Sequence, residues 1–263
     1  MSALTKWRPR RATSISLVMM AVTVLVTVEA AGQAAVSPSG TEHQPFTAKY
    51  LLTYLDEQGA AINFSGTFYR SADGYFSRIE ETEGPPGVRG TNHNIANVAD
   101  RSWTSANSYT HTSTVTVYVD DRKFQDMVNG VAGNCALLED GSFNRIGSSE
   151  LLGFKVVETE YKIGRAMVSR DSIAPELGCF VLQHLLVDRG EVRAIEQVTQ
   201  ITLGEPDPAA FRVPVGYAEV SPLEFEARWK QLFGQDYYGA AQAKRLELEY
   251  QQGKARQRQR NNR

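Results

Sequence analysis

Residues 46–81, FTAKYLLTYLDEQGAAINFSGTFYRSADGYFSRIEE, determine the predicted fold of this chain. Over residues 46–54, apolar residues alternate with others in a period-two pattern that is typical of strands burying one face. The alternation returns over residues 62–69 and 75–81. Glu57-Gln58-Gly59 and Asp73-Gly74 separate the three runs, and the Asp-Gly pair favours a type I′ hairpin turn. The segment therefore predicts three antiparallel strands in sequence order.

More strands are predicted after this meander. Gly84-Pro85-Pro86-Gly87 interrupts the sheet, since proline cannot donate to a strand ladder, and a polar stretch follows to about Ser113. Residues 121–131 predict a short helix. Pro206, Pro208, Pro214 and Pro222 mark a crossing segment without strands. Strand patterns resume at residues 114–119, 154–161, 165–170, 179–187 and 192–203, with a hairpin at Asp188-Arg189-Gly190.

A second helix begins at Ser221-Pro222-Leu223-Glu224, because serine suits the N-cap, proline the first helical position and glutamate the capping box. It ends near Gly234. The fold class is therefore mainly β (α+β). We expect a single curved antiparallel sheet or open half-barrel, with one or two packed helices, a C-terminal helix and a basic disordered tail.

The two ends of the chain are predicted to lie outside this fold. Four basic residues precede a 14-residue apolar run, Ile15 to Val28, and small residues follow it, which is the order of a secretory signal peptide. An uncleaved N-terminal anchor is the alternative. With the signal removed, no transmembrane segment is expected, and the protein is periplasmic or extracellular. The predicted organisation is a signal peptide (1–34), a linker (35–45), an antiparallel β domain (46–220), a C-terminal helical segment (221–252) and a disordered basic tail (253–263).

Charge is unevenly distributed along the 263 residues. The formal net charge is −2, but residues 31–240 hold 17 basic and 27 acidic residues, whereas residues 241–263 carry +5. A content of 42% hydrophobic and 22% charged residues excludes a wholly disordered chain. A basic tail can bind an anionic partner or fold back on its own acidic domain. Nucleic acid is not expected as a partner of an exported protein.

The sequence contains no motif for catalysis. It lacks the GxSxG, SxxK, Walker A and GxGxxG patterns, and its four histidines lack zinc-ligand spacing. His93 is expected in a polar loop and His184 in the core or at an edge. Glu80 and Glu81 are adjacent, so in a strand they point to opposite faces, and with Glu83 they suggest a solvated edge. We therefore expect no enzyme, no catalytic residue, no metal and no cofactor.

Two cysteines, Cys135 and Cys179, are present. An even number of cysteines in an exported protein favours a disulfide between them, and two buried free thiols are the alternative.

Aromatic residues provide the candidate binding site. Tyr50, Tyr54, Phe64 and Phe68 should lie on one face of two paired strands. They either form a core beneath the C-terminal helix or line an apolar groove for a lipid or acyl chain.

Four motifs stand out in the chain. They are Phe64-Ser65-Gly66-Thr67-Phe68-Tyr69-Arg70-Ser71, Leu152-Gly153-Phe154-Lys155-Val156-Val157, Ala174-Pro175-Glu176-Leu177-Gly178-Cys179 and Gly204-Glu205-Pro206-Asp207-Pro208 with Phe211, Val213-Pro214 and Gly216-Tyr217. These motifs resemble those of exported, β-rich bacterial proteins of unknown function, over residues 46–222 but not over 84–150. The order of elements is similar, more distantly, to the lipoprotein-carrier and sigma-factor-regulator half-barrels of the bacterial envelope. The resemblance implies an open half-barrel that holds acyl chains under a helical lid, and it implies no catalytic residue.

Together these features predict a non-enzymatic exported envelope protein. It would bind an apolar ligand, a lipid or a lipidated protein on the concave sheet face. The alternative is a structural or interaction module that docks a protein or an anionic partner through a sheet edge and the basic tail.

Overall fold

The computed structural model describes residues 44–55, 59–83, 88–118, 120–132, 135, 138, 143–163 and 166–261. The predicted signal peptide, most of the predicted linker and the break at residues 84–87 lie outside these residues.

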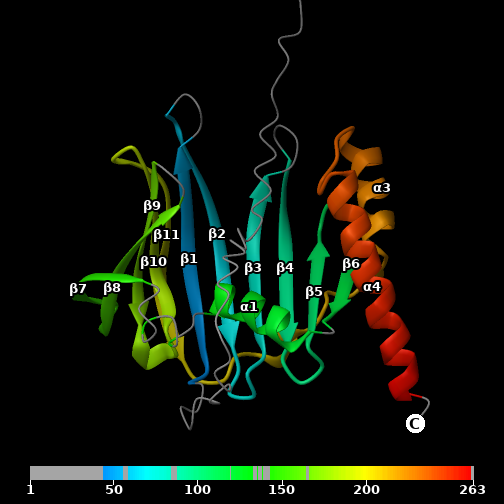
Figure 1. Ribbon diagram of the computed structural model, residues 1–263, viewed down its shortest axis with the longest axis horizontal. Coiled ribbons are helices and arrows are strands. Elements are labelled where there is room, and N and C mark those ends of the chain that lie inside the picture. Colours follow the sequence, from blue (N-terminus) through cyan, green and yellow to red (C-terminus); the bar gives the residue numbers. More distant parts are fainter. Residues whose placement is uncertain are drawn as a thin grey trace, which may run out of the picture.

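One open, curved sheet of twelve strands forms most of the described structure (Figure 1). In space the order is β12-β6-β5-β4-β3-β2-β1-β11-β10-β9-β8-β7. Neighbouring strands are antiparallel except β12 and β6, which are parallel, so the sheet is mixed. The predicted mainly β class is confirmed, with this one parallel pair as a correction. The strands are β1 (Phe46–Leu55), β2 (Ala61–Arg70), β3 (Phe76–Glu83), β4 (Arg89–Asn97), β5 (Ser102–Asn107), β6 (Thr112–Val117), β7 (Asn144–Leu151), β8 (Phe154–Ile163), β9 (Met167–Ala174), β10 (Phe180–Asp188), β11 (Glu191–Leu203) and β12 (Ala218–Glu219).

The three strands predicted from residues 46–81 are present as β1 to β3. Strand β1 buries alternate residues, Phe46, Ala48 and Tyr50, as its period-two pattern requires. The turn at Asp73-Gly74 is not type I′, because only Gly74 has a positive φ (81°). Ser71 accepts from the N–H of Gly74 and donates its own N–H to Tyr75, which makes a longer loop.

Strand β1 joins the two halves of the sheet, since it pairs with β2 on one side and β11 on the other. The meander β1–β6 therefore continues directly into the meander β7–β11. We call the face that carries Phe46, Tyr50 and Phe68 the inner face, and the opposite one the outer face. Helix α1 (Asp121–Ala132), predicted over 121–131, lies over the inner face (Figure 1), where Val128 packs against the core.

Helix α3 (Pro222–Phe233) confirms the predicted start at Ser221, whose Oγ accepts from the N–H of Glu224 at 3.3 Å. It ends at Gly234, which adopts φ 71°. The turn after α3 is fixed by Glu226, which accepts from the backbone N–H groups of Tyr237 and Tyr238 at 2.9 Å each. Helix α3 packs at the β6 end of the sheet, not over β1 and β2. Its aromatic cluster consists of Tyr109, Phe225, Trp229, Phe233, Tyr237 and Tyr238.

The prediction of a disordered tail is wrong for residues 253–261, because they belong to helix α4, which runs from Ala240 to Asn261. Glycine in a helix usually weakens it. Here Gly253 is buried against Val117 of β6, where a Cβ atom would come within 2.9 Å of the valine side chain. This close approach supports the helix across the glycine, and Lys254 makes an ion pair with Glu219 directly after it.

The crossing segment 204–217 is confirmed as largely without strands. It connects β11, beside β1, to β12, beside β6, and therefore passes β1 to β5. It contacts the outer face through Phe211, whose ring meets those of Tyr69 and Tyr75. His93 Nε2 lies 2.9 Å from the carbonyl oxygen of Ala210 and 2.7 Å from Ser77 Oγ. His93 is thus a buried residue of β4, not a loop residue.

The segment Ala174–Cys179 forms a tight corner between β9 and β10. A short 3-10 helix over Pro175–Leu177 is followed by two left-handed residues, Gly178 (φ 64°) and Cys179 (φ 63°). The guanidinium of Arg70 donates to the carbonyl of Leu177 at 2.7 Å, and one of its nitrogens lies 2.7 Å from the position that a Cβ atom of Gly178 would take. The predicted disulfide between Cys135 and Cys179 is present, and it ties the segment after α1 to this corner.

Candidate functional site

Three of the four predicted binding residues belong to the packed core. Tyr50, Phe64 and Phe68 are buried, whereas Tyr54 is half-buried and stacks on Phe64 at 5.5 Å between ring centroids. Phe68 lies in a stack with Phe46, Phe76 and Phe180. Tyr50, Phe64 and Phe68 therefore agree with the interpretation that these aromatic residues form a core. The helix that packs on this core is α1, and not the helix at residues 221–233. Their role in ligand binding stays a prediction.

Tyr50 connects this core to a group of charges. It is paired in register with Gly66 of β2, and its ring lies over that glycine, where a Cβ atom would overlap it. The missing side chain at Gly66 thus allows the Tyr50 ring to reach toward β3. There its hydroxyl donates to Glu80 Oε2 at 3.2 Å.

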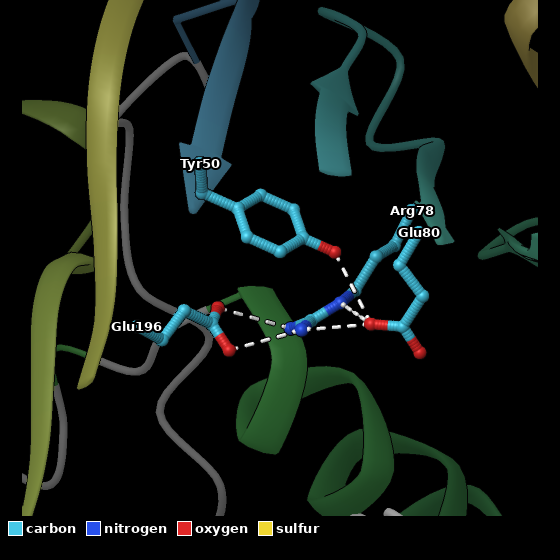
Figure 2. Close-up of polar contacts among 4 residues, drawn as sticks. All are labelled: Tyr50, Arg78, Glu80 and Glu196. Carbon is cyan, nitrogen blue, oxygen red and sulfur yellow. Dashed lines mark hydrogen bonds and ion pairs between the residues drawn. The ribbon is translucent and has the colours of Figure 1, made fainter. Parts of the chain in front are cut away.

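The centre of the inner face is an ion cluster on three strands, β1, β3 and β11 (Figure 2). Arg78 Nε donates to Glu80 Oε2 at 3.0 Å, and its two terminal nitrogens donate to both oxygens of Glu196 at 3.2 and 2.9 Å. The guanidinium carbon lies 4.6 Å from the centroid of the Tyr50 ring, a cation–π contact. One cation therefore serves two carboxylates, and the cluster carries a net charge of about −1.

The ion cluster is enclosed but reachable. The side chains of Arg78, Glu80 and Glu196 are 20%, 14% and 27% exposed. Burial and the two carboxylates raise the pKa of the Tyr50 hydroxyl, against the lowering charge of Arg78, so this hydroxyl stays a hydrogen-bond donor. The second oxygen of Glu80 points away from the other three residues in Figure 2 and can accept from a further donor.

A second charged pair lies next to Glu196 on the same face. His184 of β10 is paired in register with both Glu196 and Asp171. His184 Nδ1 is 2.6 Å from Asp171 Oδ1. Burial alone would lower the pKa of His184, but the hydrogen bond and the charge of Asp171 outweigh it and raise the pKa. The predicted core-or-edge histidine is thus a half-exposed member of a polar row that runs from β9 to β3.

His93 and His184 have opposite effects on stability as pH changes. Burial lowers the pKa of His93, although its bond to Ala210 acts the other way, so His93 favours folding above pH 6.5 and this contribution is lost as pH falls. The raised pKa of His184 favours folding below pH 6.5, and this contribution is lost as pH rises through the folded value.

We therefore expect the stability deficit of H184Q relative to the parent to grow as the pH is lowered from about 7.5 to 5.5, and that of H93Q relative to the parent to grow as the pH is raised over that range. Urea unfolding of both variants and the parent at a series of pH values measures this. Parallel curves for the two variants would contradict the opposite signs.

Sequence reasoning identified Tyr50 but missed the charged residues around it. Glu80 was expected at a solvated edge with Glu81 and Glu83. Instead it is on the inner face and accepts from Tyr50 and Arg78, because β3 is an internal strand between β2 and β4. In the part of the chain that the structure describes, no group of three or more His, Cys, Asp or Glu residues is arranged to hold a metal ion. Among the same residues, no helix is both long and apolar enough to cross a membrane.

No protein-family profile and no curated protein matches the sequence. Solved structures with a similar fold include an uncharacterized conserved protein from Thermus thermophilus, at 12% identity and a TM-score of 0.45 over 68% of this chain and 90% of that one. The Pseudomonas aeruginosa MucA/MucB complex matches at 13% identity and a TM-score of 0.40, over 66% and 57%. A LolA superfamily protein from Nitrosomonas europaea matches at 9% identity and a TM-score of 0.34, over 66% and 92%. The predicted distant resemblance to lipoprotein-carrier and sigma-factor-regulator half-barrels is present as a likeness of fold.

Proposed function

We propose that the protein is an exported, non-enzymatic binding module of the bacterial envelope, and that it takes an amphiphilic ligand on its inner face. The observation that carries the proposal is the juxtaposition, on that face, of a large aromatic core with a reachable ion cluster. The core offers apolar surface to a chain. The cluster offers acceptors to a polar head.

Helix α1 is the element that would have to move for a ligand to enter. Its described side-chain contacts join Phe124 and Met127 to Tyr118, Asp121 to Arg101, and Val128 to the aromatic core. The disulfide at Cys135 follows the helix closely and would retain it at one end. An apolar chain would then lie between α1 and the Phe46–Phe68–Phe76 stack, and its head would lie at Glu80.

The charge of the cluster indicates which head fits. Arg78 neutralises only one of the two carboxylates, so an ammonium or hydroxyl donor is favoured over a carboxylate or phosphate alone. Lysophosphatidylethanolamine provides an ammonium group and one acyl chain, whereas a free fatty acid provides an anionic head and a similar chain.

Native mass spectrometry of protein purified from its own cell envelope tests the proposal. We expect a bound lipid mass, and retention of added lysophosphatidylethanolamine in preference to a fatty acid. E80Q should reduce retention of lysophosphatidylethanolamine several-fold, because it removes the negative charge at the proposed position of the head group. E83Q is the matched control, because Glu83 is exposed and lies on the outer face of the same strand. Protein that arrives empty and stays empty with both lipids would overturn the proposal.

A second function is favoured by the charge of α4. Residues 253–261 contain four basic and no acidic residues, and the end of α4 projects beyond the sheet (Figure 1). This segment would dock an anionic partner. Deleting residues 255–263 should abolish salt-sensitive binding to vesicles containing phosphatidylglycerol and leave the unfolding curve unchanged. Undiminished binding after the deletion would exclude this role.

A further inference from the structure

The two edge strands of the sheet differ in how far other elements cover them. At one end, β12 pairs with β6 at Thr112 and Ser113, and Gly253 of α4 packs directly on the backbone of Val117. At the other end, β7 pairs with β8 on one side. No residue that the structure describes pairs with its other side. Among the residues that the structure describes, one edge strand is therefore covered and the other has an unpaired side.

Strand β7 has only part of the usual protection of an open edge. All residues from Asn144 to Glu150 are exposed, including Ile146 at 48%. Edge strands are usually protected by charged side chains, proline, a bulge, or a covering helix or loop, because unpaired backbone groups otherwise recruit another strand. Strand β7 (NRIGSSEL) has a bulge and two charged residues of opposite sign, which a second strand can pair with, and it has no lysine or proline. An exposed isoleucine on such an edge favours the binding of a partner strand that covers it.

A β-bulge determines on which face of the sheet the charged side chains of β7 lie. Arg145 is opposite Thr159 and Gly147 is opposite Glu158, so Ile146 is an extra residue. Ser148 and Glu150 are opposite Val157 and Lys155. Since Thr159, Val157 and Lys155 alternate with the residues between them, Arg145, Ser148 and Glu150 share one face of the sheet. Without the bulge, Arg145 and Glu150 would lie on opposite faces.

We propose that β7 pairs antiparallel with β7 of a second copy of this chain, about a two-fold axis through Ser148. In this register Gly147 lies opposite Ser149 of the second copy, and Arg145 lies opposite its Glu150. Two opposite-charge pairs then form, one on each side of the axis, on the same face. The axis is perpendicular to the sheet, so the joined sheet presents both inner faces on the same side.

The charge pattern of β7 supports a second copy over an unrelated strand as its partner. The strand is self-complementary only when antiparallel to itself, and only because the bulge restores Arg145 to the face of Glu150. The guanidinium of Arg145 is held beside the strand by a hydrogen bond to the carbonyl of Leu138 at 2.7 Å. This proposal does not depend on the ligand that the inner face takes.

Sedimentation velocity of the mature chain and its charge reversals tests this. The parent should be dimeric. R145E and E150R should each raise the dimer dissociation constant about tenfold, because two like-charge contacts replace two attractive ones. The double variant R145E/E150R should restore it. Mixing the two single variants should give a heterodimer, since each then supplies the charge that the other needs.

Thermal unfolding of each variant separates assembly from folding. E150R also meets Lys155 within its own chain, and R145E loses the bond to Leu138, so both lower stability somewhat. Neither effect predicts heterodimer formation. A monomeric parent, or a dimer that neither reversal weakens, would overturn the proposal.

Discussion

Replacing Arg78 with methionine should lower the free energy of unfolding by about 3 kcal/mol, the largest effect we expect from one side chain. Methionine keeps much of the apolar stem and removes the charge. Glu80 and Glu196 would then face each other on the inner face without a cation, at side-chain exposures of only 14% and 27%. Burying a charge without its partner costs far more than losing an exposed ion pair.

A triple variant distinguishes uncompensated charge from lost packing. In R78M/E80Q/E196Q the two carboxylates are neutral, so most of the lost stability should return. R78K is the second control, because lysine keeps the charge but cannot donate to both oxygens of Glu196 and to Glu80 in one plane. We expect R78K to fall between the parent and R78M. Urea unfolding of the four proteins measures this, and a triple variant no more stable than R78M would show that packing of the guanidinium dominates.

The strands that sequence could identify are those with one apolar face. Strands β1 and β2 bury one side against the aromatic core, so their side chains alternate clearly. Strands β4 and β5 were missed because their inner faces carry a polar ladder. There Asn107 donates to Asn92 and Ser105 to Asn94, both at 2.7 Å. Such a ladder satisfies its own hydrogen bonds and leaves no period-two pattern of apolar residues.

Strand β7 was missed for a different reason. It is exposed on both faces and contains a bulge, so nothing in its composition distinguishes it from a loop. The helix in the tail was missed because the contact that supports it, between Gly253 and Val117, joins residues distant in the chain. Composition alone favours disorder there.

The site was predicted only in part because its geometry depends on register. Tyr50 followed from the alternation of β1. Arg78 and Glu196 are 118 residues apart in sequence and meet only because β11 joins the sheet beside β1. No local pattern contains that pairing. The one signal in the sequence was Gly66, since a glycine inside a strand often marks the close approach of another group.

Reducing the Cys135–Cys179 disulfide should lower the free energy of unfolding by about 4 kcal/mol in the chain-entropy model, from a sequence separation of 44 residues. The closed loop contains β7, β8 and β9, so the cross-link restrains a quarter of the sheet in the unfolded chain. Guanidinium unfolding with and without reductant measures the effect. The variant C135S/C179S should match the reduced parent and should not respond to reductant.

The backbone at Cys179 allows the cross-link to be separated from local strain. Cys179 adopts φ 63°, a conformation that favours glycine over residues with a Cβ atom. C135S/C179G should therefore be about 1 kcal/mol more stable than C135S/C179S, although neither has a disulfide. Equal stabilities would show that the corner relaxes once the disulfide is gone, so that the cross-link itself holds Cys179 in the left-handed conformation. A glycine variant as stable as the oxidised parent would instead show that the corner, and not the loop closure, accounts for the stabilisation.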